Sequence, residues 1–307
     1  MSRKAEWLQR LEYAAYRAVA KRAAKASPES VLRWGSRIGT LSRTVVRSRD
    51  RRAMNNLRRA FPEKSHDELR RILDECWRHF GREMLNYIRL QQLPTEEVLR
   101  SVKNVNLEVL REAEALGKGV VVISAHYGGW EVGGLTMMSL VPKVCTVARK
   151  LDNAYLERDL VASRARAGAD FVERRRAARS LMKALAEKSV VVLLPDQSVI
   201  PREGVLVSFV GRPAWTTPAP ARLALHHGTP IVFAFCIPDG TGHRLEFEGP
   251  IRVDQLGEGE RDPVALTQRI NDVITRRIVA RPELWLWMHD RWKGTGESEP
   301  VNGQSNR

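Results

Sequence analysis

Short, fully apolar runs that alternate with helix-compatible segments are the feature that most restricts the fold of this chain. The run Val-Val-Val-Leu-Leu at residues 190–194 would be apolar on both faces of an extended strand. Strands of this kind are typical of sheets that helices cover on both sides. The pattern predicts an α/β fold with a mixed, largely parallel sheet covered by helices, preceded by an N-terminal basic amphipathic helical segment.

The expected strands span residues 120–124, 144–148, 190–194, 231–237 and 244–248. The expected helices between and after them span residues 131–140, 155–167, 175–187, 218–227 and 263–279. A capping box, Ser65-His-Asp-Glu68, predicts the start of a further long helix. Sites in such folds form beyond the carboxyl ends of the strands, so polar residues at those ends are the first candidates for function.

The net charge of +15 is concentrated near the N-terminus, because residues 1–60 contain 16 Lys/Arg and only 4 Asp/Glu. Two apolar stripes at helical spacing run through this segment with arginines around them, namely Trp7, Leu8, Leu11, Ala15, Ala18 and Val19, and Val31, Trp34, Ile38, Leu41 and Val45. Basic amphipathic helices with tryptophans are typical of proteins that lie on an anionic membrane surface. Alternatively, both helices pack on the protein body and their arginines are simply solvated.

No apolar run approaches 18 residues and no signal-peptide pattern is present, so we expect attachment to a membrane without a span. Nucleic acid is not an expected partner, because the chain has no recognisable nucleic-acid-binding motif.

The 307 residues contain no Pro/Gly/Ser-rich linker, so one continuous fold is expected. Within it, residues 1–60 would form the membrane-associating helices, residues 61–293 the α/β domain, and residues 294–307 a disordered polar tail. Cys76, Cys145 and Cys236 are widely separated, which argues against a disulfide framework and against a zinc site. They are expected to be reduced core residues of a protein in, or facing, the cytosol.

The segment His126-Tyr-Gly-Gly-Trp-Glu131 follows the apolar run at 120–124 and places a histidine at a strand exit. An imidazole can accept the proton of an alcohol near neutral pH, and a nearby carboxylate can fix its tautomer. With 7 histidines and 36 acidic residues in 307 positions, about one His-x4-Asp/Glu pair is expected by chance. A second pair, His243 and Glu248, lies in an alternating segment that predicts a half-exposed strand. His126 is the better candidate, although a structural histidine satisfied by a neighbour is the alternative.

Polar residues follow two further strands, at Arg149-Lys150 and at Pro195-Asp-Gln-Ser198. Arg149 would bind a phosphate or polarise a carbonyl, and Arg164 would be a further anion ligand unless it is only solvated on a helix. Asp196 and Gln197 would line a pocket or make a turn. Because the sequence has no Gly-rich phosphate loop and no cluster of metal ligands, neither a cofactor nor a metal is expected.

Six segments in order make the chain resemble the bacterial late acyltransferases of lipid A biosynthesis, the lauroyl/myristoyl acyltransferase family of the lysophospholipid acyltransferase superfamily. The resemblance begins with the basic helices and Asn56-Leu-Arg-Arg-Ala-Phe-Pro62 and covers nearly the whole chain. The six segments are His126-x4-Glu131, Arg149 with Asp152-Asn153, Pro195-Asp196-Gln197, the ten residues from Phe209 to Pro218, Gly228-Thr-Pro-Ile-Val232, and Trp287-Met-His-Asp-Arg-Trp-Lys293.

The resemblance implies transfer of a fatty acyl chain from acyl carrier protein, or acyl-CoA, to a hydroxyl of a lipid A precursor or related glycolipid. It implies that His126 is the general base and that Glu131 orients it. By the same resemblance, Arg149, Arg164, Asp196 and Gln197 would bind the acceptor or the intermediate. Gly128 and Gly129 would leave backbone space and amides beside the reacting centre. The implied location is the cytoplasmic face of the bacterial inner membrane, with peripheral or monotopic attachment.

Two details of the resemblance leave the identity of the acceptor open. Many relatives carry Asn immediately before the tryptophan of the histidine motif, where this chain has Gly129, and mycobacterial mannoside acyltransferases are similar in layout. A phosphatidylinositol mannoside acceptor, a lysophospholipid acceptor, and a membrane lipid-binding protein without chemistry are the alternatives. The transmembrane anchor common in the family is absent or much reduced here, which favours attachment by the basic helices.

Overall fold

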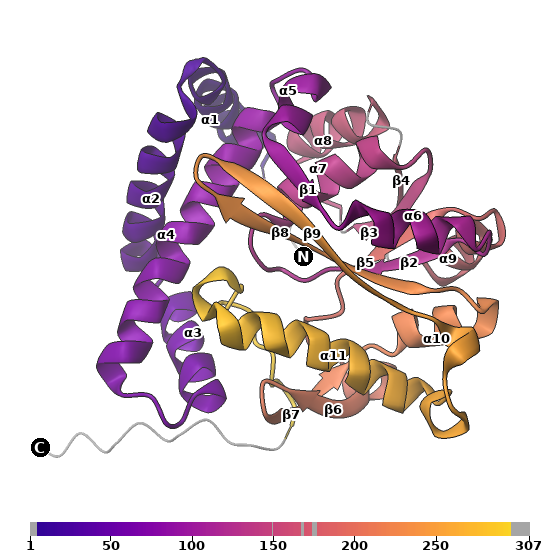
Figure 1. Cartoon of the computed structure of the whole chain (residues 1–307). Coiled ribbons are helices and arrows are strands. Elements are labelled where there is room, and N and C mark those ends of the chain that lie inside the picture. Colours follow the sequence, from indigo (N-terminus) through magenta and orange to yellow (C-terminus); the bar gives the residue numbers. More distant parts are fainter. Residues whose placement is uncertain (1–4, 149, 167–168, 174–176, 296–307) are drawn as a thin grey trace, which may run out of the picture.

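A computed structural model describes residues 5–148, 150–166, 169–173 and 177–295 of the chain (Figure 1). A seven-stranded sheet with the order β1-β9-β8-β2-β5-β3-β4 forms its centre. All neighbouring strands run parallel except β8 and β9, which form an antiparallel pair. The strands are β1 (Val102–Val105), β2 (Val120–Ile123), β3 (Val144–Ala148), β4 (Ala169–Glu173), β5 (Val190–Leu193), β8 (Ile231–Asp239) and β9 (Gly242–Ile251).

The predicted mixed, largely parallel sheet is therefore confirmed, and each of the five predicted strands is present. Sequence analysis missed β1 and β4 at the two edges of the sheet. It also missed a separate antiparallel hairpin, β6 (Val205–Phe209) with β7 (Arg212–Thr216). The sequence of β1, Val-Lys-Asn-Val, has only two apolar residues, so it carries too short a pattern to be recognised.

Helices cover both faces of the sheet (Figure 1). One face packs on α5 (Thr95–Arg100), α6 (Leu107–Ala115) and α7 (Trp130–Leu140). The other packs on α3 (Arg47–Ala60), α4 (His66–Leu90), α9 (Ala177–Ala186), α10 (Ala219–His227) and α11 (Pro263–Ala280). The remaining helices are α1 (Glu6–Lys25), α2 (Pro28–Val45) and α8 (Ala154–Arg166). The capping box predicted at Ser65 is present at the start of α4, with both of its reciprocal hydrogen bonds.

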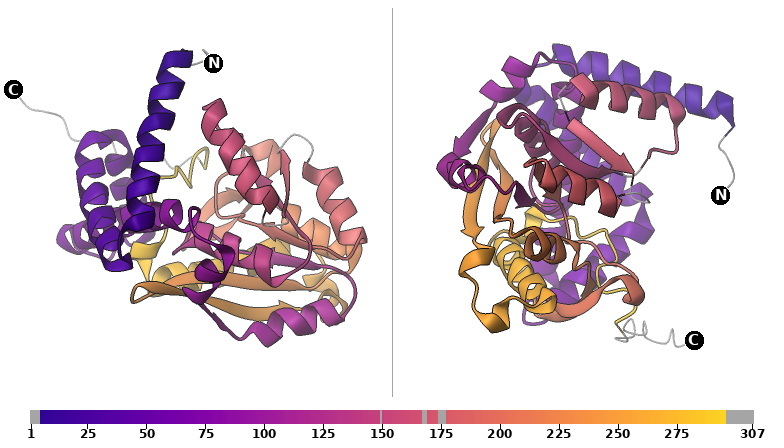
Figure 2. Two further views of the ribbon diagram at one scale, coloured as in Figure 1. Left: turned by 90° about the horizontal axis from the view of Figure 1, so that it is seen from above. Right: turned by 90° about the vertical axis from the view of Figure 1, so that its right-hand side faces the viewer.

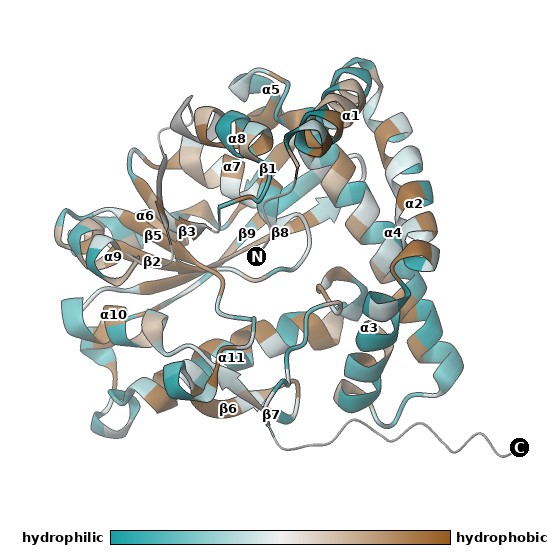
Figure 3. Ribbon diagram, turned by 180° about the vertical axis from the view of Figure 1, so that it is seen from behind, coloured by the Kyte–Doolittle hydropathy of each residue, from teal (hydrophilic) through white to brown (hydrophobic). Residues whose placement is uncertain are grey.

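Glycines form the closest contacts between α2 and α4, and of the apolar stripe Val31 is buried in a cluster with Leu85 of α4. A Cβ at Gly35 would lie 2.7 Å from Arg82 Cα, and a Cβ at Gly39 would overlap the carbonyl oxygen of Trp77. The apolar side chains of Ile38 and Leu41 are consequently exposed, by 49% and 65%. Figure 3 shows hydrophobic residues on the outward side of these N-terminal helices. In the described residues, no helix is long and apolar enough to cross a membrane.

Gly39→Ala is expected to destabilise the fold by about 1–3 kcal/mol, because the added methyl group must push two helix backbones apart. Ile38→Ala is the matched control on the exposed side of the same helix turn, where a change of less than about 0.5 kcal/mol is expected. Urea unfolding of both variants measures the difference. Equal stability of the two would show that α2 adapts without cost.

Candidate active site

Asp196 is the carboxylate that holds His126. The two residues follow β2 and β5, which are parallel neighbours, so their carboxyl ends meet at one edge of the sheet. His126 Nδ1 lies 3.0 Å from Asp196 Oδ1, and the backbone N–H of His126 donates to Asp196 Oδ2 at 2.9 Å. The indole N–H of Trp285 donates to the same Oδ2 at 2.8 Å. Three donors therefore fix one fully buried carboxylate.

The electrostatics of the pair favour a charged imidazole beside an ionised carboxylate. Burial lowers the pKa of His126, but the charge and hydrogen bond of Asp196 outweigh it, with a smaller contribution from Glu131, so that the pKa is raised. Burial raises the pKa of Asp196, and His126 and Trp285 outweigh that effect, so that it is lowered. The pair is therefore suited to stabilising an imidazolium formed during a reaction.

The second ring nitrogen of His126 is directed to the ligand side of the site. Its Nε2 lies 3.2 Å from Gln197 Nε2, and both side chains line the same large cavity. With Nδ1–H donated to Asp196, Nε2 carries a lone pair that accepts from the Gln197 amide. Trp130 packs on the imidazole with ring centroids 5.5 Å apart, and Phe80 of α4 packs on Trp130 at 6.3 Å. Asp196 and Trp130 thus hold the imidazole in place, and its Nε2 atom faces the cavity as a proton acceptor.

The cavity has a volume of about 1510 Å³, which exceeds the roughly 300–1,000 Å³ of ordinary small-molecule sites. Its wall is mostly apolar and comes from the sheet and from helices of both faces, as with Val122, Met137 and Leu181. His126, Glu131 and Gln197 are polar groups in this wall. A base beside a long apolar cavity suits a ligand with a reactive polar end and a hydrocarbon chain.

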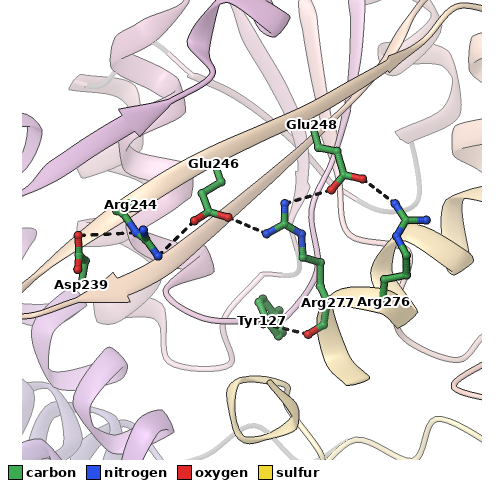
Figure 4. A network of polar contacts seen from close by, with 7 residues as sticks. All are labelled: Tyr127, Asp239, Arg244, Glu246, Glu248, Arg276 and Arg277. Atoms are coloured by element: carbon green, nitrogen blue, oxygen red, sulfur yellow. Dashed lines mark hydrogen bonds and ion pairs between the residues drawn. The ribbon is translucent and has the colours of Figure 1, made fainter. Parts of the chain in front are cut away.

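Tyr127 and Gly128 attach the His126 loop to α11 and to the segment that follows it. The Tyr127 hydroxyl donates to the carbonyl oxygen of Arg277 on α11 at 3.0 Å, and Tyr127 forms an isolated β-bridge with Trp285. Figure 4 shows Tyr127 next to a chain of ion pairs in which Arg277 contacts Glu246 and Glu248 of β9. Gly128 has φ +63°, and a Cβ there would overlap the carbonyl oxygen of Cys236.

The two glycines of the motif contact the protein and not the cavity. Their backbone N–H groups donate to Leu284 O and to Cys236 O, at 2.9 and 2.8 Å, and neither residue is part of the cavity wall. These contacts differ from the expected ones, in which Gly128 and Gly129 would face the reacting centre. Their amides are occupied because the loop packs directly on β8 and on the segment after α11.

The other predicted site residues divide into three groups. Asp196 and Gln197 meet His126, as the strand order allows, and Asp196 takes the hydrogen-bonding position that we expected for Glu131. Glu131 lines the cavity from the first turn of α7 and affects His126 through its charge. Arg149 and the side chain of Arg164 lie outside the described residues, so their assignment remains a prediction.

A second polar connection at this edge of the sheet was not predicted from the sequence. The Ser198 backbone N–H donates to His289 Nε2 at 3.1 Å, and the Ser198 hydroxyl donates to the carbonyl oxygen of Asp290 at 2.9 Å. Asn56 in turn donates to the carbonyl oxygens of Trp287 and His289. Three segments singled out in the sequence, around residues 56, 196 and 289, are therefore one hydrogen-bonded unit behind the histidine.

A buried acid–histidine pair lies under the His126 loop and was also missed. Glu83 Oε2 of α4 lies 2.8 Å from His243 Nε2 of β9, and both side chains are almost fully buried. A Cβ at Gly129 would lie 2.6 Å from Glu83 Oε2. The predicted alternating, half-exposed strand at 243–248 is confirmed, because His243 is on the buried face of β9 and Glu248 is on the opposite, partly exposed face. Burial raises the pKa of Glu83, but His243 and His79 outweigh it, so that the pKa is lowered.

His243→Ala is expected to destabilise the protein by about 3–5 kcal/mol, because it leaves the Glu83 carboxylate buried without its partner. His243→Gln retains an N–H donor and should lose distinctly less. His66→Ala is the exposed-histidine control. Thermal and urea unfolding measure all three variants, and equal losses for His243→Ala and His243→Gln would contradict the role of the hydrogen bond.

Across the residues that the structure describes, no three His, Cys, Asp or Glu side chains are grouped so as to hold a metal ion. The fold and the site define an α/β protein with a carboxylate-oriented histidine in the wall of a cavity large enough for a long apolar ligand.

Comparison with known proteins assigns the chain to a family. The model of the family described as bacterial lipid A biosynthesis acyltransferase matches residues 2–294. The chain is 25% identical over 273 residues to the lipid A biosynthesis lauroyltransferase of Escherichia coli, covering 88% of this chain and 87% of the relative. It is 25% identical over 253 residues to the lipid A biosynthesis myristoyltransferase of the same organism (82% and 78%). The chain belongs to this family and is an acyltransferase.

A relative with a different acceptor in its name is also similar. The phosphatidylinositol mannoside acyltransferase of Mycobacterium tuberculosis is 26% identical over 218 residues, covering 69% of this chain and 67% of the relative. The two kinds of relative have nearly the same identity to this chain, so identity alone does not choose between their acceptors.

Proposed function

We propose that this protein is an O-acyltransferase that moves a fatty acyl chain from acyl carrier protein, or acyl-CoA, to a hydroxyl of a lipid A precursor or related glycolipid. The observation that carries the proposal is the His126–Asp196 pair in the wall of the apolar cavity. The family membership supports acyl transfer, and the names of the relatives support a glycolipid acceptor.

His126 acts as the general base. The acceptor hydroxyl displaces the Gln197 amide from Nε2, gives its proton to Nε2 and attacks the thioester carbonyl. A C–O bond forms, and the tetrahedral intermediate then loses the thiol as the C–S bond breaks, with the imidazolium returning the proton to sulfur. Asp196 holds the Nδ1–H tautomer and stabilises the imidazolium, as a triad aspartate does. The displaced Gln197 amide is then available to donate to the intermediate.

Glu131 has a different part in this scheme from the one expected from the sequence. Its side chain lines the cavity, and Asp196 already occupies the hydrogen-bonding position on His126 Nδ1. We assign Glu131 to the acceptor, where a carboxylate can accept a hydrogen bond from a hydroxyl of the glycolipid. Arg149 and Arg164 are proposed anion ligands for the acceptor or intermediate, as the resemblance implies.

The site is proposed to work at the cytoplasmic face of the bacterial inner membrane. The exposed apolar residues of α1 and α2, among them Trp7, Leu11 and Leu41, support attachment of these helices to the anionic surface. The glycine-mediated packing of α2 explains how a helix can be firmly docked and still present its apolar side to lipid.

The pH dependence of the reaction should follow the raised pKa of His126. Because the base must be neutral to act, kcat/KM should fall as the pH decreases through a value above the ordinary histidine pKa of about 6.5. In Asp196→Asn, burial acts without the opposing charge, so the pKa of the His126 imidazole should be lower than in the wild type. A pH–rate profile from pH 5 to 9 measures the acid limb of the wild type, and an NMR titration measures the imidazole of the variant. A wild-type acid limb at or below the ordinary value would contradict the assignment.

The decisive experiment is an acyl-transfer assay with purified protein in detergent. Lauroyl and myristoyl carrier protein and acyl-CoA are the donors, and a lipid A precursor, a lysophospholipid and a mannosylated phosphoinositide are the acceptors. Transfer to the lipid A precursor that disappears in a folded His126→Ala variant is expected. Preference for the mannosylated acceptor would support the alternative suggested by the mycobacterial relative. Binding to lipid without transfer to any acceptor would overturn the proposal in favour of a lipid-binding protein.

A further inference from the structure

Helices α1 and α8 lie side by side at the rim of the cavity, although they are about 150 positions apart in the sequence (Figure 2). Tyr16 and Arg17 of α1 and Leu156 and Leu160 of α8 all belong to the cavity wall. Met182 of α9 is another wall residue, and it is 40% exposed. The entrance to the cavity is therefore bordered by these helices.

The seam between α1 and α8 combines hydrogen bonds with the stacked rings of Tyr13 and Tyr155, whose centroids lie 5.6 Å apart. The Tyr13 hydroxyl donates to Asp159 at 2.6 Å, and Arg10 Nε donates to the Tyr155 hydroxyl at 3.1 Å. Asn153, just before α8, donates its side-chain amide to the carbonyl oxygen of Gln9 at 2.9 Å. The seam thus uses hydroxyl, carboxylate and amide groups, while the apolar side chains of Trp7, Leu11 and Val161 remain exposed.

Those apolar side chains point to solvent. On α1, Trp7 is 68% and Leu11 is 60% exposed, and on the α8 side, Val161 is 50% and Leu151 is 41% exposed. Leu151 is also part of the cavity wall, and exposed apolar residues on the helices that border a cavity mark a surface that binds something apolar. Basic residues accompany them, because α1 contains five Lys/Arg and two Asp/Glu.

We propose that α8, together with α1, forms a docking lip that inserts its apolar side chains into an anionic bilayer, so that the cavity opens toward the lipid. The lip is defined as Trp7, Leu11, Leu151 and Val161. This inference rests on the proposed function, and it extends the membrane contact from the N-terminal helices to α8, which packs against α1 at the rim of the cavity. An acyl chain and a glycolipid acceptor could then reach His126 without crossing water.

A bilayer fits this surface better than an acidic protein or a second copy of the chain. An acidic protein would satisfy the arginines but not the tryptophan and the aliphatic side chains, and the net positive charge of α1 opposes pairing with its own copy. An interfacial tryptophan with basic neighbours on an amphipathic helix is the combination that binds anionic lipid.

The test uses single cysteines labelled with an environment-sensitive fluorophore at Leu11→Cys, Val161→Cys and Val279→Cys. Val279 is a matched control, since it is 53% exposed on α11, and α11 covers the opposite side of the molecule (Figure 2). The native thiols should not react, because all three are buried, and burial raises the pKa of Cys76 to about 12 and that of Cys236 well above its usual value. Labels are read with vesicles of phosphatidylglycerol and of phosphatidylcholine.

On phosphatidylglycerol vesicles, the fluorescence emission of the labels at 11 and 161 should shift to the blue and be quenched by lipid-borne quenchers. The emission of the label at 279 should remain that of a label in water. Shifts should be smaller on phosphatidylcholine. A label at 161 that stays in water while that at 11 inserts would overturn the role of α8. Oligomerisation without insertion would point to a second copy as the occupant and would also overturn the proposal.

Activity separates this inference from the proposed function. In Val161→Asp, but not in Val279→Asp, the ratio of transfer on vesicles to transfer in detergent should fall. A protein that transfers acyl chains in detergent but inserts no label would refute the docking lip alone. A protein that inserts both labels but transfers nothing would refute the proposed function.

Discussion

Asp196→Asn should lower kcat by about 10³-fold or more, in line with the effect of the same change in a Ser-His-Asp triad. The backbone N–H of His126 and the indole N–H of Trp285 would continue to bind the amide oxygen. The amide NH₂ group would then face Nδ1 as a donor, which forces the proton of the imidazole onto Nε2. In that tautomer the base cannot accept the proton of an acceptor hydroxyl.

Glu131→Gln is the matched control for this prediction, because it removes a carboxylate charge from the same cavity. We expect it to act chiefly on KM for the acceptor, with a smaller effect on kcat, since Glu131 affects His126 only through its charge. Steady-state kinetics with saturating donor measures both constants. The reverse order, in which Glu131→Gln abolishes kcat and Asp196→Asn does not, would restore the orienting role to Glu131.

His126→Ala should lower kcat by about 10²–10⁴-fold, the contribution of a positioned general base. Among the described residues, the His126 side chain makes hydrogen bonds to the side chains of Asp196 and Gln197 and none to the backbone, so its removal should leave the loop attached through the backbone N–H of His126 to Asp196. Single-turnover transfer from labelled acyl carrier protein measures the loss, and circular dichroism and thermal unfolding establish that the variant is folded.

His226→Ala provides a control for the histidine change, because His226 also lines the cavity but belongs to α10 and has no contact with Asp196 among the described residues. Its kcat should remain close to that of the wild type. A folded His126→Ala protein with wild-type turnover would mean that another group removes the proton.

The sheet and most helices could be predicted because burial on both faces leaves a local pattern. The run at 190–194 is β5 at the centre of the sheet, whereas β1 and β4 at the edges carry shorter patterns and were missed. The alternation at 243–248 was predicted correctly, with His243 and Glu248 on opposite faces of β9. The partner of His243 was not predicted, because Glu83 is 160 positions away and comes from α4.

The partner of His126 could not be predicted from spacing. His126 and Asp196 are 70 positions apart, and they meet only because β2 and β5 are adjacent in the sheet. Glu131 was the natural expectation because it is near in sequence, but it belongs to the first turn of α7, which points it into the cavity. The sequence does identify all three residues, and the strand order decides which of them touch.

Two consecutive residues of α4, Phe80 and Gly81, connect helix α2 to the catalytic candidate His126. Gly81 receives the backbone of α2, while Phe80 packs on Trp130, which packs on His126. Because the two helix backbones touch at the glycines, the position of α2 relative to His126 is set by backbone contacts as well as by side chains such as Val31 and Arg43. A surface that binds α2 is therefore held at a fixed position relative to the base, which restricts the hydroxyl groups of a surface-bound substrate that can reach Nε2.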